Sequence, residues 1–198
     1  MKYDPIEPEV VASYTALSSQ KEFMQRTQLV FLHIPLPEYA GLPALRGVNG
    51  LFNAALTKGI VPFPWNHVPW LVRYFGRDRI VGCSLINTGL FEAVKFNDTK
   101  LKQFAVAQPH KSTTAPVTSA MFCGHDHYCD AVMKRDGVYL CYGRISSTTP
   151  PSNWEGDGGP LPFELGARII QICPPTNKVE TWIEVRSGEE PGSRICLD

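Results

Sequence analysis

The sequence predicts an α/β domain that combines mixed sheets with flanking helices and long loops. Residues 7–25 place apolar side chains at roughly helical spacing, which indicates a helix. The continuous apolar run Leu29–Leu32, which prolines end, is typical of a strand buried on both faces in the middle of an α/β sheet. The 17 prolines and 16 glycines among 198 residues predict long irregular connections.

The first half of the chain is predicted to form a helix, a strand and a long irregular segment. Pro8 stands near the start of the predicted helix, whose periodic positions include Val10, Val11 and Leu17. His33 falls at the carboxyl end of the strand predicted within residues 28–37, where open α/β sheets usually bind ligands. Residues 38–77 are rich in glycine, proline and aromatics, and we expect at most one short helix there, near 51–58. A short strand that runs into a turn is predicted for residues 79–89, and a helical or mixed segment follows it.

The second half of the chain is predicted to form mainly strands. Residues 117–127, "VTSAMFCGHDH", give an apolar strand that ends in a glycine and two histidines. Residues 131–143 predict a hairpin, because Asp136-Gly137 is a favoured two-residue turn between apolar strands. Residues 166–185 predict two more strands around a Pro-Pro-Thr-Asn turn. The length suits a single domain over residues 1–198.

Composition excludes several classes of function. The 19 basic and 19 acidic residues cancel, so no overall field attracts nucleic acid or an anionic membrane. No apolar run approaches the roughly 18–20 residues that span a bilayer. The amino terminus shows no signal peptide, and the six cysteines form no C-x-x-C pair, which disfavours a disulfide framework. We therefore expect a cytoplasmic protein without nucleic-acid or membrane partners.

Residues 121–130, "MFCGHDHYCD", carry the densest group of potential ligands. Neutral imidazole is a common ligand of zinc and iron, and Gly124 allows a bend that could point His125 and His127 into one cavity, with His33 as a third ligand. A closed zinc site with Cys123 and Cys129 is disfavoured, because such sites usually draw ligands from two separated knuckles. The third interpretation is a polar turn after a strand, with both cysteines as small buried side chains.

Other candidate side chains receive no role from the sequence. His67 and His110 read as loop histidines without catalytic function. Glu38 and Tyr39 follow the His33 strand directly and could line the same cavity. No catalytic residue is assigned.

Several segments together resemble a known family. In order along the chain these are "FLHIPLPEY", "INTGLFEAV", "CGHDH" and "GARIIQI". They are similar to the carboxyl-terminal half of calcineurin-like metallophosphoesterases, in the branch related to purple acid phosphatases. The resemblance implies part of a four-layered αββα sandwich that hydrolyses phosphate esters. It also implies that His33 and His125 ligate one metal ion and His127 a second, with iron, zinc or manganese as one or two bound ions.

The chain departs from the family before its first strand. The family's Asp-x-His, Gly-Asp-x-x-Asp and Gly-Asn-His motifs precede the strand that holds the equivalent of His33, and none of them occurs in the 32 residues before His33. The sequence therefore predicts either a metal-dependent phosphoester hydrolase, or a truncated form of one, or a catalytically inactive domain that binds metal, phosphate or a protein. A homo-oligomer or a partner chain would cover the missing half of the sandwich.

Overall fold

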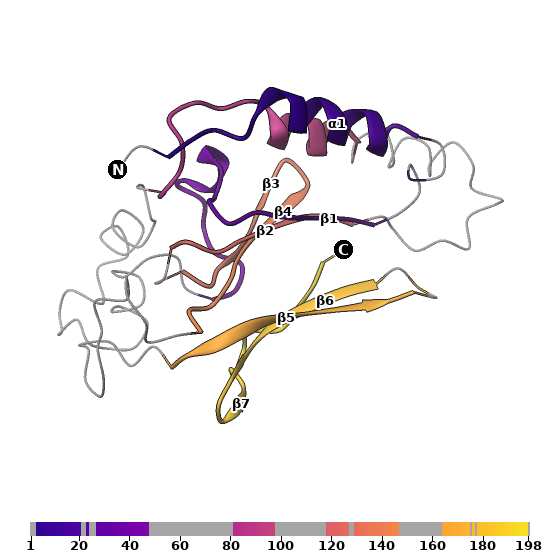
Figure 1. The fold of residues 1–198 in the computed structure, drawn as a ribbon. Coiled ribbons are helices and arrows are strands. Elements are labelled where there is room, and N and C mark those ends of the chain that lie inside the picture. The colour runs from indigo at the N-terminus through magenta and orange to yellow at the C-terminus, as the bar shows by residue number, and fades with distance from the viewer. Residues whose placement is uncertain are drawn as a thin grey trace.

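The computed structural model of the protein describes residues 3–20, 23, 27–47, 81–97, 118–126, 129–146, 164–174, 176 and 178–197. Figure 1 shows three layers, with helices above a first sheet and a second sheet below it. The prediction of a mixed α/β fold is confirmed. The elements in chain order are α1 Pro8–Ser18, β1 Gln28–Phe31, the 3₁₀ helix η1 Pro37–Tyr39, β2 Ser119–Cys123, β3 Val132–Arg135, β4 Val138–Tyr142, β5 Gly166–Cys173, β6 Lys178–Val185, β7 Gly188–Glu189 and β8 Ile195–Leu197; residues 90–97 are also helical.

The first sheet has the strand order β1-β2-β4-β3. Strands β1, β2 and β4 run parallel, and β3 runs antiparallel to β4. Every residue of β2 and β4 is buried, as their continuous apolar sequences predict. The predicted hairpin is confirmed: Asp136 and Gly137 form its turn with positive φ values of 48° and 90°.

Strand β1 corrects one prediction. It lies at the edge of the sheet and pairs with β2 alone among the described strands, so it is not a central strand buried on both faces. Phe31 is 65% exposed and stacks on the ring of Phe122 at a centroid distance of 5.4 Å. Leu29 packs on the apolar cluster between the two sheets, and Val30 and Leu32 pack on the core cluster of the opposite face, so Phe31 is the exposed side chain of this run.

The helical layer covers the upper face of the first sheet. Val11 and Tyr14 of α1 pack on the core that includes Phe91 and Val94 of the 90–97 helix. Helix α1 is shorter than residues 7–25 predict. It ends at Ser18, whose hydroxyl donates to the Thr15 carbonyl, because short hydroxyl side chains bond nearby backbone and compete with helix extension.

Two of the periodic apolar positions in α1 do not face the core. Val10 and Leu17 are 54% and 52% exposed. The "INTG" segment also departs from the prediction, because the described residues 81–89 contain bends and no strand. Residues 90–97 then form the helix that the following sequence allows.

The second sheet is antiparallel and stacks below the first. Strand β6 alternates strictly, with its even-numbered side chains outward and its odd-numbered side chains buried, as the period of a half-covered strand requires. The inner face joins the first sheet through an apolar cluster that combines Phe122, Tyr139 and Cys141 with Val179 and Leu197. Thr118 also donates its hydroxyl to the Leu197 carbonyl at 2.6 Å.

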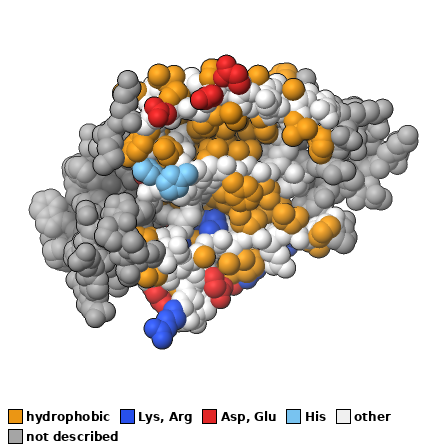
Figure 2. Space-filling view, in the orientation of Figure 1, with side chains coloured by type: hydrophobic (Ala, Val, Ile, Leu, Met, Phe, Trp, Pro, Cys, Tyr) orange, Lys and Arg blue, Asp and Glu red, His pale blue; other side chains and the backbone are white. Residues whose placement is uncertain are grey.

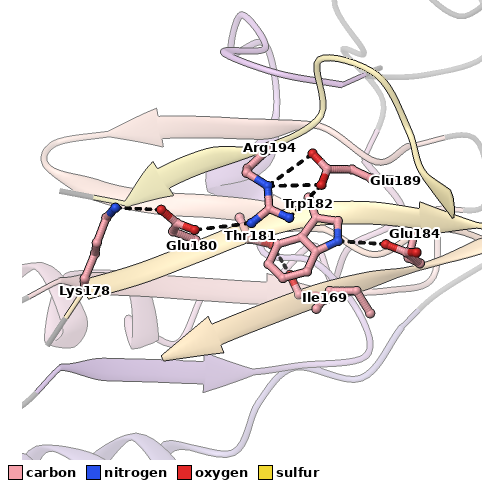
Figure 3. Close-up of polar contacts among 8 residues, drawn as sticks. All are labelled: Ile169, Lys178, Glu180, Thr181, Trp182, Glu184, Glu189 and Arg194. Atoms are coloured by element: carbon pink, nitrogen blue, oxygen red, sulfur yellow. Dashed lines mark hydrogen bonds and ion pairs between the residues drawn. The ribbon is translucent and has the colours of Figure 1, made fainter. Parts of the chain in front are cut away.

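The outer face of the second sheet is polar (Figure 3). The Arg194 guanidinium lies 3.7 Å from the ring centroid of Trp182 and pairs with Glu189 and Glu180. Lys178 extends this network by pairing with Glu180 at 2.7 Å. The described residues place no helix on this face.

A buried charge network ties the two sheets together near the end of β2. Arg144 Nη1 lies 2.5 Å from Asp130 Oδ2, with only 2% and 3% of the two side chains exposed. Arg168 of β5 donates to the carbonyl oxygens of Tyr142 and Asp130 and to the Thr181 hydroxyl. The segment that follows the two histidines of "GHDH" is thereby fixed to both sheets.

The described cysteines form no disulfide. Cys123 and Cys129 are 4% and 1% exposed and belong to the upper core cluster, so the interpretation as small buried side chains is confirmed. Within the described part of the chain, no helix combines the length and the apolar character needed to cross a membrane.

Buried thiols and phenols should make stability depend on pH in alkaline solution. Burial raises the pKa of Cys141 from 9.0 to about 12, against an opposing effect of the nearby Arg168 charge. Burial also raises the pKa values of Cys123, Tyr39 and Tyr142. These groups stay protonated in the folded chain at a pH where the unfolded chain loses their protons. The stability that these groups contribute to the folded chain is fully present below about pH 9, and it is lost as the pH rises toward their folded-state pKa values.

The measurable consequence is the slope of stability against pH. The unfolding free energy of the wild type should fall as the pH rises from about 9.5 to 11.5. In Cys141→Ala this fall should be less steep by about 1.4 kcal/mol per pH unit, the value for one proton. Urea unfolding at half-unit pH steps measures both slopes, and Cys173→Ala removes an exposed thiol as the control. Equal slopes for wild type and Cys141→Ala would contradict the assignment.

Candidate functional site

Two histidines meet at the carboxyl edge of the first sheet. Strands β1 and β2 are parallel neighbours, and His33 and His125 each follow their strand by two residues. Their ring centroids lie 5.4 Å apart with the planes at 78°, and the Gly124 amide donates to the His33 carbonyl at 3.1 Å. Figure 2 shows a patch of histidine side chains at the surface. The adjacency expected of His33 and His125 is thus present, and their role as metal ligands stays a prediction.

The remaining histidines lie outside the described residues. These are His67, His110 and His127. The third predicted metal ligand, His127, is therefore not placed relative to the first two.

The bend in "GHDH" occurs at His125 itself and not at Gly124. His125 has a φ of 67°, which is unusual for a residue other than glycine. The Asp126 amide donates to the Gly124 carbonyl at 2.8 Å, and the Cys129 amide donates to the Asp126 carbonyl at 3.1 Å, so the turn is closed on both sides. Non-glycine residues with such backbone cluster at functional sites, where the surrounding structure holds them in place.

The 81–89 segment lies against this turn. A Cβ atom at Gly82 would stand 2.7 Å from Cδ2 of His125 and 2.8 Å from Oδ1 of Asp126, so only glycine allows the approach without a shift of those side chains. Asn87 donates its side-chain amide to Oε1 of Glu38, and its own Oδ1 accepts from the Gly89 amide at 3.0 Å. The segment therefore contacts both the "GHDH" turn and Glu38 of η1.

Two carboxylates at the site keep one oxygen each without a hydrogen-bond partner in the described residues. These atoms are Oε2 of Glu38 and Oδ2 of Asp126, and both are buried. Burial raises the pKa of the Cys83 thiol, a backbone hydrogen bond partly opposes this, and the charges of Asp126 and Glu38 raise the pKa further. The site is therefore rich in acceptors and negative charge.

The residues beside the site divide into lining and core. Glu38 accepts a hydrogen bond from Asn87 of the 81–89 segment. Tyr39 belongs to the core: it is fully buried, donates its hydroxyl to the Met121 carbonyl at 2.9 Å and packs edge-on against the Tyr142 ring. Tyr142 is also fully buried, and its pKa is raised by burial first and by the Asp126 carboxylate second. On the outer side, the ring of Tyr3 meets His125 edge-on at 4.8 Å.

The donor set fits a metal ion only in part. Two imidazoles and two carboxylates are the ligand types that zinc, iron and manganese accept. In the described residues, however, no three His, Cys, Asp or Glu side chains form a group that could hold an ion. The zinc site with Cys123 and Cys129 gains no support, because both thiols are core side chains.

Sequence reasoning missed the contributions of Gly82, Cys83 and Asn87. The Asn-x-Gly spacing in "INTG" is a turn signal, and it could have placed Asn87 in a tight loop. No local pattern could have shown that this loop would reach Glu38 and Asp126.

Comparison with protein-family models, curated proteins and solved structures finds no match to this chain.

Proposed function

We propose that the chain is a metal-dependent phosphoester hydrolase of the calcineurin-like type. The observation that carries this proposal is the contact between His33 and His125, whose rings lie 5.4 Å apart although they come from strands far apart in the sequence. The carboxyl edge of parallel strands is where α/β folds bind ligands. The order of the segments that resemble the family supports the same reading.

The proposed ligands are His33, His125 and His127. When bound, one or two ions of iron, zinc or manganese would polarise phosphoryl oxygens and activate a water molecule for attack on phosphorus. His33 is exposed and His125 is half-buried, so a phosphate ester could reach this edge from solvent. The closed turn around Gly124 would hold the His125 ring in one orientation toward it.

The second candidate is a catalytically inactive domain that binds metal, phosphate or a protein partner. The observation that favours it is the absence, in the described residues, of an assembled group of three ligands.

Metal content and hydrolysis measured together separate the two candidates. We expect purified full-length chain supplied with iron, zinc or manganese to retain metal by plasma mass spectrometry and to hydrolyse p-nitrophenyl phosphate or bis-p-nitrophenyl phosphate. His125→Ala/His127→Ala and His33→Ala should lose both properties, whereas the control His110→Ala should keep them. Retained metal without hydrolysis would establish the binding domain instead. No retained metal in the wild type would overturn both candidates.

A further inference from the structure

We propose that the outer edge of strand β1 is a dimer interface, at which a second copy of this chain pairs its own β1 antiparallel to the first. The pairing is centred on Val30, so that Leu29 of each copy lies opposite Phe31 of the other. The first sheets of the two copies then form one continuous sheet. The inference goes beyond the proposed function and does not depend on a bound metal.

The outer edge of β1 presents backbone groups that have no ladder partner among the described strands. Gln28 and Leu32 donate their amides to carbonyl oxygens within residues 118–122, at 2.9 and 2.8 Å, so the even-numbered residues of β1 face β2. Because backbone groups alternate in direction along a strand, Leu29 and Phe31 direct their N–H and C=O groups away from β2. Such a row of donors and acceptors is a template for a further strand.

The opposite edge of the same sheet is protected, whereas the edge at β1 is not. At the far edge, Val132 of β3 exchanges backbone hydrogen bonds with Arg46, and the strand also carries Lys134 and Arg135. Covering segments and charged side chains are devices by which proteins block the addition of a strand. Residues 27–34, in contrast, contain no Lys, Arg, Asp or Glu. The β1 edge is therefore open to pairing.

The side chains of β1 also suit a contact with another strand. Phe31 is 65% exposed although it stacks on Phe122, which belongs to the apolar cluster between the two sheets. Figure 2 shows hydrophobic side chains gathered in the middle of this face, where β1 runs in Figure 1. Removing an aromatic ring from water against an apolar neighbour is favourable, so a strand laid along β1 would gain stability from Phe31.

The strand is complementary to itself, which points to a second copy as the partner. Residues that oppose each other in an antiparallel pair and point their backbone groups at each other exchange both hydrogen bonds. With Val30 opposite its own equivalent, Leu29 and Phe31 meet the partner's Phe31 and Leu29, so every outward N–H and C=O group of the two strands gains a partner. Phe31 then covers the partner's Leu29, and the two Val30 side chains meet on the other face. A twofold axis through this centre gives the closed symmetry of a dimer.

The residues that flank the strand favour this register. A pair centred on Phe31 would place Leu29 opposite the partner's His33, whose carbonyl already accepts a hydrogen bond within its own chain at 3.1 Å. A pair centred on Leu29 would place Phe31 opposite the partner's Thr27, which lies outside β1. The centre at Val30 uses strand residues alone. The two copies of His33 then follow opposite ends of the paired strands, so the candidate sites stay apart.

Substitutions at Phe31 test the edge and leave the amides that bond β2 in place. Sedimentation equilibrium of the full chain would compare the wild type with Phe31→Ala, which removes the ring, and Phe31→Pro, which removes the ring and the outward N–H. We expect a dimeric wild type, a dissociation constant raised roughly tenfold or more in Phe31→Ala, and a monomeric Phe31→Pro. Phe96→Ala is the matched control, because Phe96 is 53% exposed on the 90–97 helix, and it should leave the dissociation constant unchanged.

A disulfide tests the register and does not depend on how well the Phe31 variants fold. Opposite residues that lie between the bonded pairs of antiparallel strands have Cα atoms about 4.5 Å apart, which a disulfide can span. Val30→Cys, in a chain whose exposed Cys173 is replaced by serine, should therefore give a covalent dimer when diamide takes up the two hydrogens that the thiols lose. Leu85→Cys in the same background is the control, since this position is 90% exposed and lies away from β1 in the sequence.

Three results would overturn the inference. These are a monomeric wild type, a dimer that keeps its dissociation constant in Phe31→Pro, and a Leu85→Cys chain that cross-links as efficiently as Val30→Cys. Since none of these measurements involves metal or hydrolysis, failure of the dimer leaves the proposed function to its own test.

Discussion

Replacement of Asp130 by alanine is expected to lower the free energy of unfolding by about 3–5 kcal/mol, since it leaves a buried charge without its partner. Arg144 is 2% exposed, and its guanidinium lies 2.5 Å from the Asp130 carboxylate. The next carboxylate is that of Glu190, at 3.8 Å from Nη2. Water cannot replace the lost partner easily at such a depth. Urea unfolding of wild type and Asp130→Ala measures the difference.

Two comparisons show whether the loss comes from burial of the charge. Asp130→Ala/Arg144→Met removes both charges and should recover a large part of the stability, as buried pairs replaced by apolar side chains usually do. Glu189→Gln breaks the pair with Arg194 on the outer face of the second sheet, where 40% and 38% of the side chains are exposed, and it should have a much smaller effect. A single Asp130→Ala variant as stable as Glu189→Gln would mean that solvent reaches Arg144.

Local patterns predict most of the described elements of this fold. The run "SAMFC" and the Asp136-Gly137 turn specify β2 and the β3-β4 hairpin almost completely, because burial and turn chemistry act over a few residues. The position of β1 could not be read in the same way. A short apolar run looks alike at the centre and at the edge of a sheet, and only the pairing order, which is a long-range property, places Phe31 at 65% exposure.

The candidate site, like the fold, could be predicted from the sequence only in part. His33 and His125 could be paired from the sequence, because each follows an apolar strand and parallel strands end at a common edge. The approach of Gly82 to His125 and the bond from Asn87 to Glu38 depend on how the 81–89 segment folds back over that edge. Nothing in the spacing of "GCSLINTG" encodes that contact. The contacts of this segment with His125 and Glu38 therefore become visible only in three dimensions.

Removal of the Tyr39 side chain is the second change expected to have a large effect. Tyr39 is fully buried, its ring meets that of Tyr142 at 5.0 Å, and its hydroxyl donates to the Met121 carbonyl in the central strand β2. Tyr39→Ala should cost about 3–5 kcal/mol of unfolding free energy, because the cavity adds to the lost apolar burial. Tyr39→Phe keeps the ring and should cost only about 1 kcal/mol for the hydrogen bond.

The two Tyr39 variants also separate packing from the arrangement of the site. Tyr39 anchors η1, and Glu38 precedes it directly, so a cavity at this position should release Glu38 from Asn87 as well as destabilise the core. Tyr39→Phe should keep the wild-type protection of the Tyr39 and Ala40 amides from hydrogen exchange, whereas Tyr39→Ala should lose the protection of this turn even at temperatures where the chain is still folded. Leu85→Ala, at a side chain that is 90% exposed, controls for an unspecific effect of truncation. If Tyr39→Phe destabilises as strongly as Tyr39→Ala, the bond to β2 and not the packing of the ring holds η1 in place.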